Sequence, residues 1–196
     1  MEKSVPIKLN KDPLKLYNGQ NKIYNYDLPV TKATIENNGN TVQITPKDDV
    51  ERCIEVKYSR YFLTEIHFHW GSKDAPGSEH VLDGMRYDLE AQFVHRDERD
   101  ETAIVSVLFE KTSSEYNGGF KSVYEVLPQI HFRDYSTELR SPLDLEVLIH
   151  HEWTSYYHYM GSLTVPECDE DVSWFILKDI NYIQRKHVRI FYLFYN

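Results

Sequence analysis

The sequence lacks any long hydrophobic run. No stretch within its 196 residues approaches the 18 or so apolar residues that a membrane-spanning helix requires. The first residues also lack the apolar core of a secretory signal peptide. We therefore expect no transmembrane segment. The expected compartment is cytoplasmic by default, and extracellular or at a virion surface if a signal has been removed.

Cysteine is scarce, because the chain has only Cys53 and Cys168. The plainer interpretation is two free thiols in a reducing compartment. A disulfide between Cys53 and Cys168 is the alternative that the sequence leaves open.

Basic residues are outnumbered. Lys and Arg total 22 against 31 Asp and Glu, which gives a formal net charge of -9. A nucleic acid or a polyanionic glycan would require a basic surface to offset its charge, so the overall balance argues against both as partners. The only compact basic run contains Arg185, Lys186, His187 and Arg189, and its simplest explanation is a solvated helix face.

The composition, 41% hydrophobic and 14% aromatic, predicts one domain over residues 1–196 with a sizeable core. No linker, internal repeat or low-complexity run divides the chain. Helical spacing of apolar residues predicts a helix over Phe120–Ile130 and a weaker one over Ile180–Leu193. The predicted strands are more numerous: Ala33–Ile35, Thr41–Ile44, Ile54–Tyr58, Leu63–Trp70, Tyr87–His95, Ala103–Glu110, Tyr157–Leu163 and Val172–Leu177.

One short motif carries most of the chemical information. His67 and His69 lie two residues apart in Leu63–Trp70, so on a strand both imidazoles project from the same face. Leu89–His95 is also typical of a strand, and it contains Gln92. Two imidazoles from one strand and a ligand from its neighbour would give the three-ligand arrangement of a catalytic zinc site. On spacing alone, the polar face of a half-buried strand is the commoner explanation of such a pair.

Further segments accompany the histidine pair, and together they resemble the α-class carbonic anhydrases. In family order these segments are Ser4–Ile7, Asn37–Gly39, Ile66–Ser72, Gly77–His80, Glu90–His95, Gly161–Pro166 and Trp174. Because the similarity covers nearly the whole chain, the chain is identified as a member of this family. The resemblance implies a mainly β (α+β) fold with a large, twisted, mostly antiparallel central sheet and few peripheral helices. It also implies a site in a cleft on one face of that sheet.

The resemblance assigns roles to individual residues. In active members three histidines bind zinc; His67 and His69 match the first two, and Gln92 stands at the third position. Glu65 and Glu90 match carboxylates that orient the ligands. The other matches are Thr164 and Glu79, which orient the zinc hydroxide, and Val94, Ile104, Leu163 and Trp174, which form the wall where carbon dioxide rests. Core packing is the alternative role for those four apolar residues.

Three departures from the family pattern point away from fast turnover. The amide oxygen of Gln92 is a neutral donor and a weaker partner for zinc than an imidazole nitrogen. Asn40 stands where the most active members carry a histidine proton shuttle, and asparagine does not titrate near neutral pH. At the cleft mouth, Val165 and Glu167 replace a threonine and a proline, and the negative charge of Glu167 would repel bicarbonate.

Relative to the family, the chain is expected to be short at both ends. The tail that such members carry places a late strand in the sheet, so its loss predicts an open sheet edge. Such an edge needs cover from another chain or from charged side chains.

Two functions remain in competition. The first is a carbonic-anhydrase-like protein with a degenerate zinc site, with zinc weak or absent, that lacks significant CO2 hydratase activity and acts in binding or adhesion. Ligand-deficient branches of the family serve as such modules, among them receptor tyrosine phosphatase ectodomains with glutamine at the third ligand position and a poxvirus envelope protein. The second is a weakly active zinc-dependent carbonate dehydratase. The expected partner is a protein or a second copy at the open edge; carbon dioxide and bicarbonate are ligands only in the second case.

Overall fold

The computed structural model describes residues 7–9, 16–17, 22–114, 119–149, 155–163 and 171–194. Its strands are β1 (Ile7–Leu9), β2 (Leu16–Tyr17), β3 (Lys22–Tyr24), β4 (Ala33–Asn37), β5 (Val42–Pro46), β6 (Cys53–Val56), β7 (Ser59–Trp70), β8 (His80–Leu82), β9 (Leu89–Arg96), β10 (Thr102–Thr112), β11 (Tyr135–Glu138), β12 (Tyr156–Gly161), β13 (Val172–Leu177) and β14 (Asn181–Gln184). Its helices are α1 (Lys121–Tyr124), the 3-10 helix η1 (Leu127–Ile130), α2 (Arg185–Phe191) and the 3-10 helix η2 (Tyr192–Phe194).

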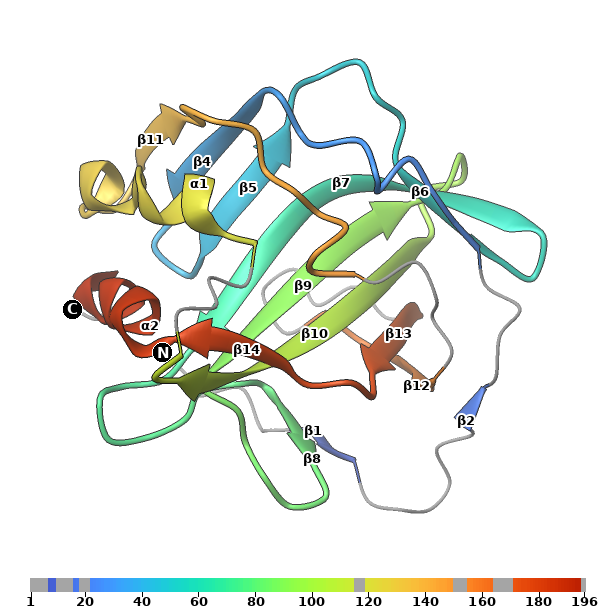
Figure 1. Cartoon of the computed structure of the whole chain (residues 1–196). Helices are drawn as coiled ribbons and strands as arrows, with labels where there is room; N and C mark the ends of the chain where they lie inside the picture. Colours follow the sequence, from blue (N-terminus) through green and yellow to red (C-terminus); the bar gives the residue numbers. More distant parts are fainter. Residues whose placement is uncertain are drawn as a thin grey trace.

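A 12-stranded sheet dominates the molecule (Figure 1). Nine of its strands follow the path β11-β4-β5-β7-β9-β10-β13-β12-β2, and β3, β6 and β14 pair off this path. Its pairings are antiparallel except that β10 pairs in parallel with both β13 and β14. This confirms the predicted mainly β fold, and the parallel pairings around β10 are a feature that the strand pattern did not indicate. Among the described residues, every helix is too short or too polar to cross a bilayer.

Burial on the strands follows their place in the sheet. The outer strand β4 alternates between buried and half-buried residues, as expected for a strand with one solvated face. The central strands β9 and β10 are buried almost throughout, because both of their faces are covered. The apolar sequence of β10 and the buried polar residues of β9 therefore both reflect a position at the centre of the sheet.

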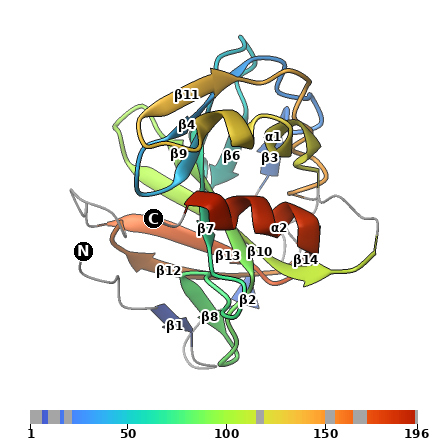
Figure 2. The ribbon, with the colours of Figure 1, turned by 90° about the vertical axis from the view of Figure 1, so that its left-hand side faces the viewer.

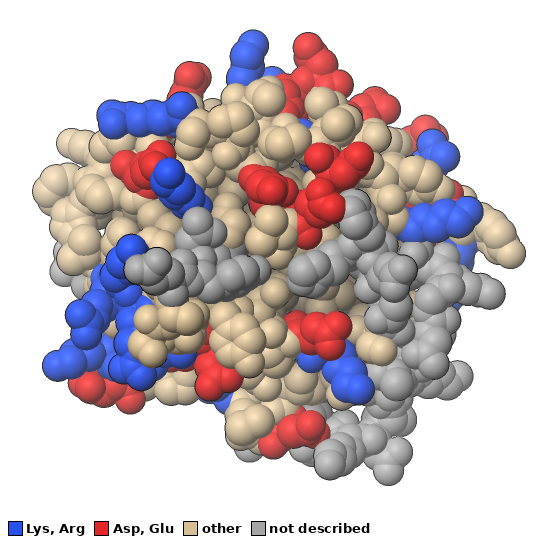
Figure 3. Space-filling model, viewed as in Figure 1, with Lys and Arg blue, Asp and Glu red and all other residues tan. Residues whose placement is uncertain are grey.

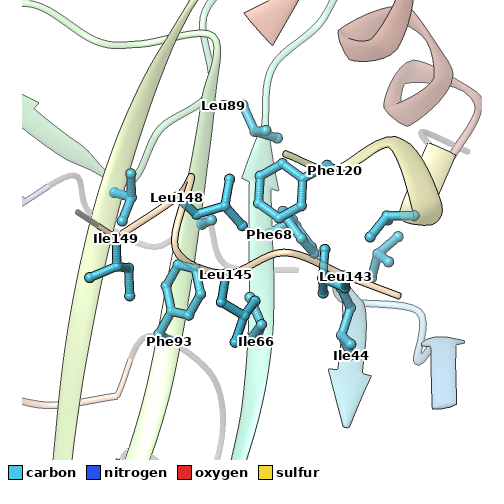
Figure 4. Close-up of a cluster of buried hydrophobic side chains, with 14 of the residues drawn as sticks. Ile44, Ile66, Phe68, Leu89, Phe93, Phe120, Leu143, Leu145, Leu148 and Ile149 are labelled. Atoms are coloured by element: carbon cyan, nitrogen blue, oxygen red, sulfur yellow. The ribbon is translucent and has the colours of Figure 1, made fainter. Parts of the chain in front are cut away.

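The larger core lies on the sheet face that the helices cover. Phe68 from β7 and Phe93 from β9 pack there against Phe120, which precedes α1, and against Leu145 and Leu148 from the segment 143–149 (Figure 4). α1 and α2 lie on the same side of the sheet (Figure 2) and contribute Val123, Val188 and Phe191 to this core. Since Phe68 points into it, its neighbours His67 and His69 project to the opposite face.

The two predicted helices differ from the structure. Over Phe120–Ile130 the chain forms α1 and then η1, because Pro128 has no N–H for the Tyr124 carbonyl and its ring would clash with that carbonyl. Over Ile180–Leu193 the first residues form β14, which pairs with β10, and only Arg185–Phe191 is α-helical. β11 was not predicted either; it is short, mostly exposed and polar, so its pattern carries little signal.

A glycine contact shapes the loop that leads from β7 to β8. A Cβ atom at Gly71 would lie 1.9 Å from the Ala75 carbonyl oxygen, and one at Gly77 would lie 2.1 Å from the Gly71 nitrogen. The two backbone segments therefore approach each other more closely than any residue with a side chain permits. This close approach brings the following residue pair, Ser78 and Glu79, back toward the histidine face of the sheet.

Candidate metal centre

The histidine face of the sheet is built from neighbouring strands in register. In the antiparallel β7–β9 pair, His67 lies opposite Gln92 and His69 lies opposite Glu90. Directly opposite residues have Cβ atoms about 5 Å apart and share a face. The structure thus brings together the two histidines, the glutamine and the glutamate that the sequence singled out.

The Gln92 side chain is almost fully buried and its orientation is fixed by carboxylates. Its Nε2 donates to Glu90 Oε1 at 2.9 Å and to Glu79 Oε2 at 3.0 Å. Because an ionised carboxylate only accepts hydrogen bonds, the amide nitrogen must face these two oxygens. The amide oxygen is therefore turned toward His69, with Oε1 3.2 Å from His69 Nε2.

His67 and Glu65 form the other side of the site. His67 Nε2 is shielded from solvent and has no hydrogen-bond partner among the described residues, although Glu65 Oε1 lies 3.3 Å away. This close contact with His67 holds the pKa of the Glu65 carboxyl below its usual value, in spite of the opposing effect of burial. Gln43 on β5 donates to Glu65 Oε2 at 2.7 Å and so fixes the carboxylate in place.

Glu90 is the hub of a fully buried polar network. Its Oε1 accepts hydrogen bonds from His80 Nδ1 at 2.6 Å and from the Ser106 hydroxyl at 2.7 Å, in addition to that from Gln92. Burial alone would raise the pKa of Glu90, but the interaction with His80 outweighs it and holds that pKa well below its usual range. His80 Nε2 in turn lies 2.8 Å from the Tyr159 hydroxyl, which links the site to β12.

An apolar wall adjoins this polar centre. Val94, Ile104 and Trp174 are buried in one smaller core cluster, and Leu163 packs against it half-buried. Val94 lies opposite Ile104 in the β9–β10 pair, and Ile104 lies beside Trp174 in the β10–β13 pair. The four residues therefore lie together on the site face of the sheet, and their packing role is evident from burial alone.

The remaining predicted residues make no contact with the centre that the described residues record. Asn40 is exposed in the turn between β4 and β5, where its backbone N–H donates to Asn38 Oδ1. Thr164, Val165 and Glu167 are outside the described residues, and so is Cys168. Cys53 is buried at the start of β6, and the pairing question for these cysteines therefore stays open.

Gln43, Ser106 and Tyr159 were missed as site residues. Gln43 lies opposite His67 in the β5–β7 pair, and Ser106 lies opposite Gln92 in the β9–β10 pair. The only sequence signal for Ser106 is a hydroxyl residue inside the apolar run 103–109. Assigning it to the network requires the strand register, which the sequence alone does not provide.

The donor atoms fit a zinc ion, with one donor weaker than usual. In the described part of the chain no cluster of three or more His, Cys, Asp or Glu is suited to a metal, so a three-ligand set around His67 and His69 there would have to include Gln92. Two ligands at about 2.1 Å from a tetrahedral zinc are separated by about 3.4 Å. The 3.2 Å between His69 Nε2 and Gln92 Oε1 is close to this value, and the buried His67 Nε2, which has no hydrogen-bond partner in the described part of the chain, projects from the same face.

Comparisons with known proteins agree with the fold. The profile of the family described as eukaryotic-type carbonic anhydrase matches residues 2–195. Carbonic anhydrase 6 of Bos taurus is 35% identical over an alignment of 167 residues, and the match covers 79% of this chain and 52% of the relative. Dioscorin DB3L of Dioscorea polystachya is 32% identical over 157 residues, 80% of this chain and 54% of the relative.

Among solved structures, the α-carbonic anhydrase of Thermovibrio ammonificans in complex with the inhibitor sulfanilamide superimposes with a TM-score of 0.81. It is 27% identical, and the match covers 96% of this chain and 77% of that one. The chain spans about half the length of the curated relatives that it matches.

Proposed function

The chain belongs to the eukaryotic-type carbonic anhydrase family, and from this membership we propose a carbonic-anhydrase-like protein with a degenerate zinc site at His67, His69 and Gln92. In this proposal the protein lacks significant CO2 hydratase activity and acts as a binding module. The observation that carries it is the pair of hydrogen bonds from the Gln92 amide to Glu79 and Glu90, which commits a neutral amide oxygen to the ligand position.

The same hydrogen bonds also engage Glu79. By family resemblance, this carboxylate should work with Thr164 to orient the reacting oxygen. Here Glu79 Oε2 accepts a hydrogen bond from Gln92 and lies 3.5 Å from His69 Nε2. A carboxylate oxygen held by the ligand set is less available for the substrate. The departures at Asn40 and Glu167 act in the same direction, since they remove a proton relay and add a negative charge.

A weakly active zinc-dependent carbonate dehydratase is the second candidate. It is favoured by the orientation of Gln92 Oε1 toward His69 Nε2, because the 3.2 Å between these atoms suits two ligands of one ion. A zinc ion held there would supply Lewis-acid activation of water. This chain's residues would hold the ion with two imidazoles and one amide, orient them through Glu65 and Glu90, and keep one side apolar through Val94 and Trp174.

Stopped-flow measurement of carbon dioxide hydration separates the two functions. For the pure full chain supplemented with zinc, we expect a rate equal to the buffer background, because the amide donor holds the cation too loosely. The zinc content of each sample is measured by elemental analysis, so that each rate can be compared with the amount of bound zinc. Turnover clearly above background and proportional to bound zinc would instead establish the dehydratase.

For the binding role we propose the outer edge of β11 as the contact surface, with a second copy of the chain as its occupant. β11 ends the path of the large sheet and pairs only with β4 among the described strands. Its first residue, Tyr135, is 54% exposed, and Phe132 just before the strand is 62% exposed, with ring centroids 5.5 Å apart. An open strand edge next to exposed aromatic rings is suited to pairing with another strand.

Sedimentation velocity over a wide concentration range tests this surface. We expect concentration-dependent self-association of the unaltered chain and its loss in the double variant Phe132→Ser/Tyr135→Ser. Tyr58→Ser is the matched control, because Tyr58 is 99% exposed in the turn between β6 and β7, and β7 is the third strand from β11 in the sheet. A strictly monomeric unaltered chain, or equal association of the double variant, would exclude the β11 edge as a self-contact.

A further inference from the structure

A groove lies between α1 and α2, on the face of the sheet opposite the histidines. It has a volume of about 350 Å³ and is lined by Lys121, Tyr124, Glu125, Lys186, His187 and Ile190. The two helices are far apart in sequence, and both pack on the large core beneath (Figure 2). The volume is at the lower end of the range for sites that bind small organic molecules.

The floor of the groove contains polar atoms without partners. Tyr124 is only 6% exposed, and its ring stacks on that of His187 with centroids 3.9 Å apart and an interplanar angle of 17°. The Tyr124 hydroxyl and His187 Nδ1 are both shielded from solvent, and neither makes a hydrogen bond within the described residues. A buried polar group left unpaired costs about 1–3 kcal/mol, so two of them side by side call for a partner.

The rim of the groove is basic. Lys121 is 75% exposed and has one loose ion pair, 3.8 Å from Glu125, and such surface pairs contribute little. Lys186 belongs to the basic run 185–189, and Figure 3 shows Lys and Arg side chains gathered over the α2 side of that view. In a chain of net charge -9, this local excess of positive charge is a feature to be explained.

We propose that this groove binds a small organic anion with an apolar, planar body. Its carboxylate or phosphate head lies between the ammonium groups of Lys121 and Lys186. Its body lies against Ile190 and the stacked rings, and one oxygen of the head accepts a hydrogen bond from the Tyr124 hydroxyl once the ligand displaces the side chains that shield it. This binding site does not depend on the histidine site, because the sheet separates the two.

The protonation states of the floor residues suit this ligand. Burial raises the pKa of the Tyr124 hydroxyl well above its usual value, so the hydroxyl remains a hydrogen-bond donor at neutral pH. Burial, and secondarily the nearby charge of Lys186, lower the pKa of His187, so its ring is neutral. A hydroxyl donor and a neutral imidazole beneath two cations accommodate an anion without any buried positive charge to desolvate.

Isothermal titration calorimetry on the full chain, with benzoate and phenyl phosphate as probes, tests the proposal. We expect saturable binding of at least one probe, with amide shifts in 1H–15N NMR spectra confined to α1 and α2. Preference between the two probes distinguishes a carboxylate head from a phosphate head. The double variant Lys121→Ala/Lys186→Ala should weaken binding at least about tenfold, a loss of about 1.4 kcal/mol.

Two further variants keep the outcome decisive. Lys32→Ala/Lys47→Ala removes the same charge from exposed lysines elsewhere, and we expect it to bind like the unaltered chain. Tyr124→Phe removes only the buried hydroxyl, and we expect weaker binding together with unchanged or higher stability in thermal unfolding. Absence of binding of both probes at millimolar concentration, or equal weakening by both lysine pairs, would overturn the proposed site.

Discussion

The variant Gln92→His is expected to bind zinc more than about 100-fold more tightly than the unaltered chain. Loss of a residue that only hydrogen-bonds to a metal ligand usually lowers the affinity by about 10–100-fold, and a change in the ligand itself should have a larger effect. The reason lies in the partners of Gln92. Glu90 Oε1 accepts from the Gln92 amide at 2.9 Å, and an imidazole could donate one ring N–H to the same carboxylate. Its second nitrogen would then replace the amide oxygen as the donor that faces His69.

Competition with a chromophoric chelator measures this gain, and carbon dioxide hydration is measured on the same samples. Gln129→His is the matched control, because Gln129 is exposed and far from the site. We expect it to leave the zinc affinity unchanged. An unchanged zinc affinity of Gln92→His, in a variant that unfolds like the unaltered chain, would show that the rest of the site has lost its capacity for metal.

The variant Glu90→Ala is expected to destabilise the fold by about 3–5 kcal/mol, the usual cost of removing one partner of a buried ionic pair. Glu90 is completely buried and accepts hydrogen bonds from His80, Gln92 and Ser106. Its loss leaves these donors without an acceptor inside the sheet. The measurement is the free energy of unfolding in urea.

Glu110→Ala is the control for this prediction, since Glu110 is exposed on the neighbouring strand β10, and we expect a change in the free energy of unfolding within about 0.5 kcal/mol.

The contribution of Glu90 to stability depends on pH in a definite direction. The folded-state pKa of Glu90 lies below the unfolded value of about 4.3, so its contribution is complete above that pH and is lost as the pH falls through the folded pKa. Glu90→Gln should therefore lose less stability in acid than the unaltered chain. Equal acid sensitivity would contradict the assigned charge state.

The sequence contained enough information to bring the central residues of the site together. The period of a strand places His67 and His69 on one face, and alternation in Leu89–His95 does the same for Glu90 and Gln92. The structure places His67 opposite Gln92 and His69 opposite Glu90, as a shared site requires. Their roles toward a metal stay predictions.

Other features depend on contacts that no local pattern records. The donation from Gln43 to Glu65 and that from Ser106 to Glu90 join different strands, so they follow from register. The strand β14 was read as part of a helix because Ile180–Leu193 has helical spacing. Its pairing with β10 prevails over that local preference.

The groove between α1 and α2 shows a third limit. The sequence indicated a basic run at residues 185–189 but no counterpart for it. Lys121 and Tyr124 lie about sixty residues earlier, and only the packing of both helices on one core brings them beside His187. Burial of the Tyr124 hydroxyl without a partner is likewise a property of the folded chain alone.

The dissociation constant of zinc for the unaltered full chain tests the central claim most directly. Titration against a competing chelator at pH 7.5 should give a value weaker than about 1 µM, or less than about 8 kcal/mol of binding free energy. That result is expected because Gln92 offers an amide oxygen where an imidazole nitrogen would bind more strongly. A nanomolar constant, with one zinc bound per chain and loss of binding in Gln92→Leu, would contradict it.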